Sequence, residues 1–388
     1  MKHHSFRTAA NKLGLTTVVD VFDKEEIYQP LDNQDVLKLS QLGGASGFSG
    51  TSAIQRSTGI SQRRLLQRNV APIDLAVAVC SELETVSGTP LDEFEHILLC
   101  HSHTDPTACE QLATRISARL NLPPNSLSAF NHGCAGFLKL MTEGSLLLEN
   151  SDAGAKVALV SVETPEFWHD GSDRLFCGIV SAGATAAILE VTDEGLPVSV
   201  VKSDDFRIPA DRRPNPDPLF SVETADVFDF HGKPCHRQVM RMNAEPVFLN
   251  GIELMLENLR SALTGIDRQD GERVVVAPHQ PSGKLLKALV AAAKLEFPDV
   301  EFLNNLEFYG NTISSSVPTL ISRMDEVLRR NGLQPMQDGD HVILLAAGIC
   351  MTEIENHMSA GHACLTWQTD ALNAVQQRQA EPVLNAAR

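Results

Sequence analysis

The chain contains two long passages, residues 94–141 and 272–324, that repeat one order of chemical patterns. Each has a short apolar run, a loop with a histidine, a helical pattern, a proline-bearing turn, another loop and a second helical pattern. His101 and His279 are 178 positions apart, and Cys134 and Asn311 are 177 positions apart. This nearly constant offset predicts a duplicated α/β unit of about 180 residues.

The apolar runs of the repeat predict strands. Residues 274–277 (VVVA) and 342–347 (VILLAA) are continuous apolar runs, which are typical of central strands covered on both faces. Strands that alternate with helical patterns predict a layered α/β fold. We divide the chain into a first half, residues 1–200, which contains Cys134, and a second half, residues 201–388, which ends in a tail.

Two segments do not follow the repeat. Residues 203–240 are rich in Pro and Asp and have little periodicity, so we expect connecting loops and a hairpin over the active-site face. After residue 355 we expect a peripheral helix followed by a frayed tail.

Composition limits the classes of function. The chain has 388 residues, 43% of them hydrophobic, and a formal net charge of −17. No apolar run approaches the roughly 18 residues of a membrane span, and the first residues lack the apolar core of a secretory signal. We therefore expect a cytoplasmic protein that does not enter a membrane. The negative charge argues against a nucleic-acid partner. The cysteines have no C-x-x-C spacing and the histidines no H-E-x-x-H spacing, so we expect no metal site.

Cys134 stands in FNHGCAGFLKL, between Gly133 and Gly136 and just before a helical pattern. One interpretation is packing, because a free cysteine behaves as a small hydrophobe and is usually buried. The other is a nucleophile at a helix N-terminus, where the dipole favours a thiolate and glycine admits a substrate to the backbone.

Pseudo-twofold packing of the halves would place His279 and Asn311 beside Cys134, although both are distant in sequence. His279 directly follows an apolar strand, and Asn311 precedes a helix that starts with small residues. A His and an Asn that face one thioester can donate two hydrogen bonds to a carbonyl on which enolate charge develops. This set suits decarboxylation of a malonyl thioester and attack of the enolate on an acyl-cysteine. Taken singly, each residue also fits a structural role.

The sequence resembles the β-ketoacyl-acyl-carrier-protein synthase III-type enzymes over about residues 55–353. GCAGF resembles the nucleophile loop of that family, and APHQ and YGNT resemble its His and Asn loops in the same order. STGISQRR resembles its Thr-Gly-Ile-Arg stretch, and VSAGATAAILE resembles a glycine-rich strand. The resemblance implies a thiolase-like fold, in which two pseudo-duplicated halves form five layers, α-β-α-β-α.

The resemblance also implies roles for particular residues. Cys134 would be the nucleophile and its N–H part of the oxyanion hole, while His279 and Asn311 would bind the extender thioester. Arg174 would contact a cofactor phosphate. A backbone N–H near Gly348 and Ile349 would complete the oxyanion hole. Three lysines on one helical pattern would form a basic patch for an acidic carrier protein, or simply a solvated face: Lys284, Lys287 and Lys294.

Several departures from the family pattern suggest a relative in specialised metabolism. Ala53 and Ser57 stand where the family has an entrance Trp and Arg, so a primer on a carrier protein fits better than free coenzyme A. Ile349 and Cys350 interrupt the C-terminal glycine run, which narrows the allowed backbone there.

We expect an acyltransferase that loads Cys134 and condenses the acyl group with a malonyl or β-ketoacyl thioester, with cyclisation as one option. It would need no cofactor beyond phosphopantetheine-bound acyl groups, and would act as a homodimer with an acyl carrier protein. Three alternatives stay open: an acyltransferase that forms an ester or amide, a silent carrier-protein-binding partner, and a thiolase-type enzyme that uses Cys350.

Overall fold

The computed structural model describes residues 5–7, 12–44, 47–213, 217–351, 356–369 and 371. Its main sheet consists of two five-stranded halves with the same order of strands. The strands of the first half are, in sheet order, β6 (Leu127–Phe130), β5 (His96–Cys100), β7 (Lys156–Glu163), β8 (Gly183–Val191) and β2 (Leu13–Asp20). Those of the second half are β13 (Glu301–Phe302), β12 (Val274–Pro278), β14 (His341–Ile349), β15 (His357–Thr366) and β9 (Leu196–Arg207).

Strand directions repeat as well. In each half the three strands at the outer end run parallel, and the two nearest the junction alternate in direction. The halves join where Leu13–Leu15 of β2 pairs with Leu196–Val198 of β9, and β1 (Ser5–Arg7) adds to β9. The predicted duplication is therefore confirmed, and β5 and β12 lead into His101 and His279 at equivalent places.

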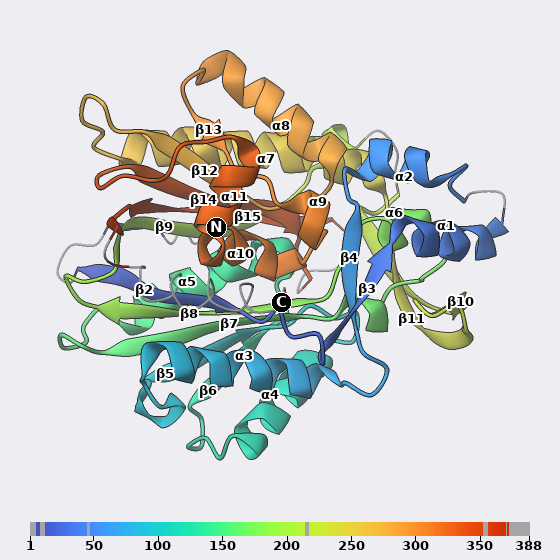
Figure 1. Ribbon diagram of the computed structural model, residues 1–388, viewed down its shortest axis with the longest axis horizontal. Coiled ribbons are helices and arrows are strands. Elements are labelled where there is room, and N and C mark those ends of the chain that lie inside the picture. Colours follow the sequence, from blue (N-terminus) through green and yellow to red (C-terminus); the bar gives the residue numbers. More distant parts are fainter. Residues whose placement is uncertain are drawn as a thin grey trace, which may run out of the picture.

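The elements stack in five layers, as predicted (Figure 1). The outer helices on the first half are α3 (Pro72–Ser87) and α4 (Ala108–Arg119), and those on the second half are α7 (Ala244–Gly265) and α8 (Gly283–Glu296). Between the half-sheets lie α5 (Gly136–Leu147) and α10 (Ser316–Ser322). Every residue of α10 is buried, as expected for a helix covered on both sides.

The turns that lead into α5 and α10 correct one detail of the predicted duplication. Each middle helix follows a 3₁₀ turn, η3 (Gly133–Ala135) or η6 (Ile313–Ser315), whose first residue has a positive φ. Matching these turns makes Gly133 equivalent to Ile313, and Cys134 equivalent to Ser314. The 177-residue spacing from Cys134 to Asn311 therefore does not join equivalent positions. A β-branched residue at φ 52° is strained by about 1–2 kcal/mol, which the surrounding loops must offset.

Two sequence-based expectations outside the repeat need correction. Residues 203–207 belong to β9 and pair with β15, although the hairpin predicted after them is present as β10 (Phe220–Phe228) and β11 (Pro234–Met242). Residues 357–366 form the central strand β15, where we expected a peripheral helix. The small residues and histidines of HMSAGHACLT have weak strand propensity, so pairing on both sides decides their conformation. The predicted tail after residue 371 lies outside the described residues.

The predicted division after residue 200 falls within β9, the first strand of the second half. The remaining strands pair as β3 (Tyr28–Asp32) with β4 (Gln62–Leu66). The remaining helices are α1 (Asn33–Leu42), α2 (Thr51–Thr58), α6 (Arg174–Cys177), α9 (Leu306–Tyr309) and α11 (Met324–Asn331). Further 3₁₀ turns are η2 (Leu91–Glu93), η4 (Pro165–Phe167) and η5 (Ala210–Arg212). Among the described residues, no helix is long and apolar enough to span a membrane.

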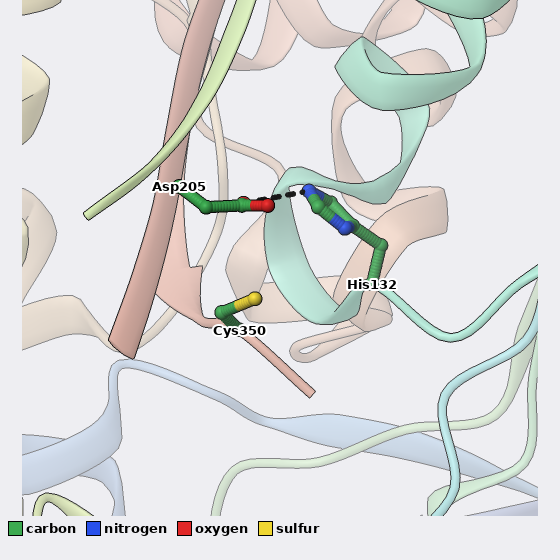
Figure 2. Close-up of side chains that lie close together, drawn as sticks. All are labelled: His132, Asp205 and Cys350. Carbon is green, nitrogen blue, oxygen red and sulfur yellow. Dashed lines mark ion pairs between the residues drawn. The ribbon is translucent and has the colours of Figure 1, made fainter. Parts of the chain in front are cut away.

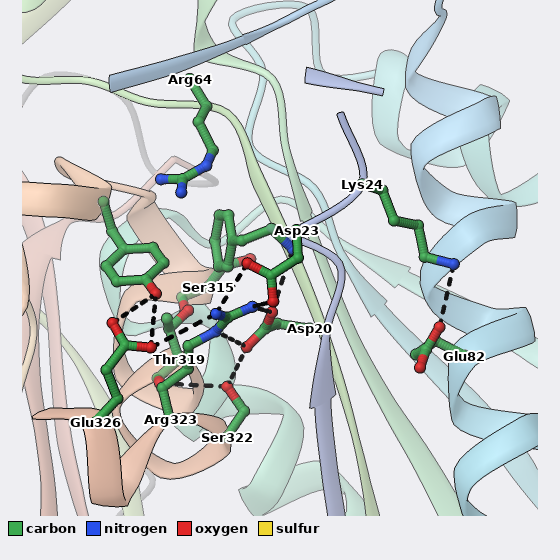
Figure 3. Close-up of polar contacts among 12 residues, drawn as sticks. Asp20, Asp23, Lys24, Arg64, Glu82, Ser315, Thr319, Ser322, Arg323 and Glu326 are labelled. Atoms are coloured by element: carbon green, nitrogen blue, oxygen red, sulfur yellow. Dashed lines mark hydrogen bonds and ion pairs between the residues drawn. The ribbon is translucent and has the colours of Figure 1, made fainter. Parts of the chain in front are cut away.

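A buried ion pair joins the ends of two elements that are distant in sequence (Figure 3). Asp20, the last residue of β2, is 2.6 Å from a guanidinium nitrogen of Arg323, which lies between α10 and α11. Both side chains are buried. Burial opposes ionisation of Asp20, but Arg323, the Ser322 hydroxyl and the Phe22 N–H together hold its pKa below the ordinary value. This pair fixes α10, and with it the loop of Asn311, against the first half.

Candidate active site

Cys134 lies in η3 at the entry to α5, in close contact with the end of β14. A β-carbon on Gly348 would be 2.5 Å from the Cβ of Cys134 and 2.8 Å from its Sγ. A β-carbon on Gly133 would be 2.5 Å from the carbonyl oxygen of Ile349. Only glycine fits at these two positions, so the loop of Cys134 and the end of β14 pack directly against each other. The prediction that these glycines admit a substrate to the backbone stays a prediction.

The electrostatic surroundings of Cys134 differ from our expectation of a thiolate. Burial raises the pKa of the Cys134 thiol to about 12, and Glu163 adds to that rise. The helix N-terminus is present, but the cost of desolvating a thiolate outweighs it. This direction of the pKa shift favours the thiol form of Cys134, although its surface is only partly buried.

Glu163 ends β7 beside the loops of Cys134 and Asn311. Its carboxyl group accepts hydrogen bonds from the N–H and hydroxyl of Ser102, at 3.1 and 2.9 Å, and from the Ser314 hydroxyl. Burial raises the pKa of Glu163 to about 8 despite these donors. A carboxyl group that is largely protonated near neutral pH avoids an isolated negative charge beside the nucleophile.

His279 directly follows β12 and is held from both sides. The backbone N–H of His279 donates to the carbonyl of Leu345 at 2.7 Å. The ring Nδ1 of His279 lies 2.7 Å from Ser316 Oγ. Burial lowers the pKa of His279 to about 3, so the imidazole is neutral at physiological pH. The Ser316 hydroxyl also lies 2.8 Å from the carbonyl of Ile313. One hydroxyl hydrogen serves one acceptor, so its direction decides whether Nε2 of His279 accepts or donates a proton.

The side-chain amide of Asn311 makes one good hydrogen bond through its oxygen and one long hydrogen bond through its nitrogen. Its Oδ1 accepts from the N–H of Ile313 at 2.9 Å, which fixes the orientation of the amide group. Its Nδ2 is 3.4 Å from the carbonyl of Pro281, in the loop that follows His279. The Nδ2 group therefore keeps capacity to donate to a substrate carbonyl.

The elements that present the three predicted catalytic residues meet at the junction of the halves. η3 contacts both η6 and β14, and a β-carbon on Gly136 would be 2.9 Å from the Cβ of Ser314. β12 pairs with β14, which brings His279 next to the strand that ends beside Cys134. The loops of Cys134, His279 and Asn311 are thus neighbours, as the expected pseudo-twofold packing requires.

Ile349 causes no strain at the position where the family resemblance implies a glycine. It is the last residue of β14 and pairs with Met358 of β15. Extended backbone suits a β-branched side chain, so the strand continues where a glycine run would end it. The preceding residue is still a glycine, Gly348, and it makes the close contact with Cys134 that a side chain would block.

The residues predicted to bind the cofactor or carrier protein lie on the surface. Lys284, Lys287 and Lys294 are exposed on α8. Lys287, Lys294 and the exposed Arg56 of α2 line a groove of about 690 Å³. Gly283 and the acidic Glu301 and Glu307 line the same groove. Lys284 is not among the lining residues, and neither is Arg174, which is exposed at the start of α6.

Sequence reasoning missed Glu163, Ser316 and Arg56. A single acidic residue at the end of the apolar run KVALVSVE was the available signal for Glu163. Ser316 lies in a run of three serines and has no distinguishing neighbour. Arg56 is important only because α2 packs beside α8, and no local pattern indicates that contact.

The duplicated arrangement, with the partly buried thiol of Cys134 against a glycine of the opposite half, is a thiolase-like fold. The family described as 3-Oxoacyl-[acyl-carrier-protein (ACP)] synthase III C terminal matches residues 264–353. The β-ketoacyl-[acyl-carrier-protein] synthase III of Koribacter versatilis is 26% identical over 314 residues, covering 77% of this chain and 86% of the relative. The corresponding protein of Oleidesulfovibrio alaskensis is 28% identical over 301 residues, covering 76% and 86%.

Solved structures agree with this fold. The 3-oxoacyl-(acyl carrier protein) synthase III of Pseudomonas aeruginosa PAO1 has a TM-score of 0.67 at 21% identity and covers 92% of this chain and 98% of its own. A priming β-ketosynthase of a polyketide biosynthetic pathway has a TM-score of 0.68 at 18% identity, with coverage of 92% and 96%. AbyA1, a tetronic acid condensing enzyme, has a TM-score of 0.65 at 15% identity, with coverage of 91% and 99%. The chain is thus similar to β-ketoacyl-[acyl-carrier-protein] synthase III proteins over about three quarters of its length, and the family model matches its C-terminal part.

Proposed function

We propose that this protein loads an acyl group on Cys134 and condenses it with a malonyl or β-ketoacyl thioester by a decarboxylative Claisen reaction. The observation on which the proposal rests is that the loops of a partly buried thiol, a neutral imidazole and an oriented amide are neighbours at one junction. A neutral imidazole and an amide can both donate hydrogen bonds without introducing a charge into the site.

Loading requires a base, because burial keeps Cys134 as a thiol. In the resting hydrogen-bond pattern Ser316 donates to the Ile313 carbonyl, so Nδ1 of His279 donates to Ser316 and Nε2 is free to accept a proton. Nε2 takes the thiol proton while sulfur attacks the incoming thioester carbonyl, and the leaving thiolate takes that proton as it departs. The acyl group is then held as a thioester on Cys134.

Condensation requires the opposite direction of the Ser316 hydroxyl. When that hydroxyl donates to Nδ1, Nε2 of His279 carries a hydrogen that can bind the extender thioester carbonyl together with Nδ2 of Asn311. Loss of carbon dioxide leaves an electron pair that both donors stabilise as an enolate. The enolate carbon attacks the acyl carbonyl, and the Cys134 thiolate leaves and is reprotonated.

The groove beside α8 supports delivery of both substrates by an acidic acyl carrier protein. Gly283, four positions after His279, lines it, as do three exposed cations, Arg56, Lys287 and Lys294, and two acidic residues, Glu301 and Glu307. Apolar side chains, among them Leu286 and Val290, line its interior. Cations at the rim suit an acidic protein surface, and an apolar channel suits a pantetheine arm. No other cofactor enters this proposal.

A role in specialised metabolism rests on the departures at Ala53, Ser57 and Ile349. Replacing an aromatic and a cationic residue in α2 removes groups that would stack on a nucleotide, so a carrier-bound primer fits better than coenzyme A. AbyA1 is a tetronic acid condensing enzyme, which makes a cyclised product one outcome to seek in product analysis.

We also propose a homodimer. β6 ends the sheet, and its four residues are only half-buried in one chain. An open strand edge with partly apolar side chains suits pairing with a second copy. Sedimentation that gives a stable monomer at micromolar concentration would contradict this.

Loading and condensation can be separated by measuring acyl-enzyme mass and carbon dioxide release side by side. Cys134→Ser should lose self-acylation. Asn311→Ala should keep it but lose carbon dioxide release and condensation by about 10²–10³-fold, because one preorganised donor is removed. His279→Ala should lose condensation and part of loading. Asn331→Ala, whose amide bonds the backbone of Asn304, serves as control. Parent rates of decarboxylation in Asn311→Ala would instead indicate an acyltransferase that forms an ester or amide, and absence of any acyl adduct would indicate a silent partner.

A further inference from the structure

Three side chains with metal-binding atoms lie together beside the nucleophile loop. His132 precedes η3, Asp205 lies on β9, and Cys350 follows β14. A ring nitrogen of His132, a carboxylate oxygen of Asp205 and the Sγ of Cys350 all lie within 4.8 Å of one another. Figure 2 shows the three side chains pointing toward one another. They come from three separate elements, so no ligand spacing in the sequence indicates them.

The His132 imidazole is the most informative member of this group. It is 3% exposed, and its Nε2 has no hydrogen-bond partner although Asp205 Oδ1 is 3.4 Å away. A buried nitrogen without a partner is unfavourable by about 1–3 kcal/mol. Two ligand atoms of one tetrahedral ion lie about 3.4 Å apart when each bond to the metal is about 2.0–2.2 Å long. The His132 and Asp205 atoms have this separation.

A catalytic relay of Cys, His and Asp does not account for the arrangement. In a relay the acid and the nucleophile bind opposite nitrogens of the imidazole, which separates their atoms by roughly 6 Å or more. Here the carboxylate oxygen and the sulfur are within 4.8 Å of each other as well as of the ring nitrogen. The donor atoms surround one point rather than forming a line.

We propose that His132, Asp205 and Cys350 bind a divalent d-block cation of the zinc type. Sulfur, imidazole nitrogen and carboxylate oxygen together select a borderline ion over calcium or magnesium, which prefer oxygen ligands. His132 and Asp205 also line a cavity of about 460 Å³, which leaves room for water as a fourth ligand. Lys139 lines the same cavity, but it is paired with Glu143 at 2.7 Å. This proposal departs from our expectation of no metal site.

Such an ion would connect the two backbone segments that form the nucleophile pocket. His132 is two positions before Cys134, and Cys350 is two positions after Gly348. A cation held by both would fix the distance between the nucleophile loop and the end of β14. Because the ion binds the folded chain, it should also raise the melting temperature in proportion to the logarithm of its concentration.

The test is titration of the purified full chain with Co²⁺, followed by absorption spectroscopy, and with Zn²⁺, followed by calorimetry. We expect one ion per chain, a thiolate-to-cobalt charge-transfer band and the visible bands of tetrahedral Co²⁺. Cys350→Ala should lose the charge-transfer band, and Cys134→Ala should keep it, which separates the proposed ligand from the catalytic thiol. Neither readout depends on condensation, so failure of the proposed function would not affect the result.

A second variant decides the question if Cys350→Ala does not fold. The Asp205 side chain is 40% exposed, so Asp205→Asn should fold, which circular dichroism can verify. It should weaken Zn²⁺ binding at least about tenfold, as loss of a ligating charge does, while Asp193→Asn, in an exposed turn, should not. Parent affinity in Asp205→Asn, a retained charge-transfer band in Cys350→Ala, or no stoichiometric binding by the parent chain would overturn the proposal.

Discussion

Gly348 and Cys134 lie so close together that any side chain at position 348 would displace the nucleophile. An alanine there would place its Cβ 2.5 Å from the Cβ of Cys134. We expect Gly348→Ala to reduce acyl loading by about 10²-fold, since a displacement near 1 Å at a reacting atom has that effect. Intact-protein mass spectrometry against time measures it. Gly251→Ala is the matched control, because its Cβ would meet only Met358 Cε at 3.7 Å. Equal loading rates in the two variants would contradict the close contact.

Ser316 should act as a positioning residue for His279. Ser316→Ala removes the partner of Nδ1, so the imidazole loses its fixed tautomer and orientation. We expect a fall in kcat of about tenfold, corresponding to one buried hydrogen bond of about 1–1.5 kcal/mol, with a small change in KM. Ser316→Thr should restore part of the rate because it keeps the hydroxyl. The control is Ser145→Ala, whose hydroxyl bonds only the carbonyl of Met141 in its own helix. A reduction of the same size in the control would indicate a general packing effect.

The buried pair of Asp20 and Arg323 should be important for stability. Asp20→Asn leaves a buried guanidinium without its nearest charge partner, so we expect a loss of about 3–5 kcal/mol in the free energy of unfolding. Asp23→Asn is the control, because that side chain is 69% exposed although it contacts the same arginine, and it should lose less than about 1 kcal/mol. Urea unfolding measures both variants. A difference between them below the error of the extrapolation would refute the assignment.

Stability should fall as the pH decreases below neutrality. Burial lowers the pKa of His101 and His362 to about 4 and that of His279 to about 3. Below the unfolded value of about 6.5, the unfolded chain binds protons that the folded chain does not, so acid favours unfolding. Each histidine should remove up to about 1.4 kcal/mol per pH unit between pH of about 6.5 and 4. Asp20, whose folded pKa is lowered, adds to the loss at still lower pH.

Urea unfolding at several pH values between about 7 and 5 tests this dependence. His101→Asn should reduce the slope of stability against pH by the contribution of one histidine, because the site no longer titrates in the unfolded chain. Glu163 and Glu166, whose folded pKa values burial raises to about 8 and about 7, act in the opposite sense over this range. A slope that is the same in His101→Asn and in the parent chain would therefore contradict the assignment of His101.

The rim of the α8 groove should decide affinity for an acidic carrier protein. Reversing three charges, Arg56→Glu with Lys287→Glu and Lys294→Glu, should raise KM for a carrier-bound substrate by about tenfold, and less at high salt. KM for a short pantetheine thioester should stay unchanged. The control is Lys12→Glu, an exposed lysine paired with Asp193 away from the groove. An equal rise in KM for both substrates would place these cations in substrate binding instead.

The sequence by itself determined the duplication, the layered α/β class and the order of the loops that contain Cys134, His279 and Asn311. Apolar runs such as VVVA and VILLAA are local and dense, so they indicate buried strands without knowledge of their neighbours. The Cys134, His279 and Asn311 loops were predicted because each follows such a strand or precedes a helical pattern. The raised pKa of Cys134 runs against the expected thiolate, because it depends on how the folded chain desolvates the thiol.

Only the tertiary structure decided the features that depend on contacts between distant segments. β15 is a central strand because β14 and β9 pair with it on both sides, and its own residues indicate this weakly. The equivalence of Cys134 with Ser314 follows from a positive φ at Gly133 and Ile313, which a β-branched residue does not suggest. The group of His132, Asp205 and Cys350 exists because an antiparallel sheet and a turn bring three elements to one point. Sequence patterns describe burial and local conformation, whereas sheet register and desolvation arise only when the chain is packed.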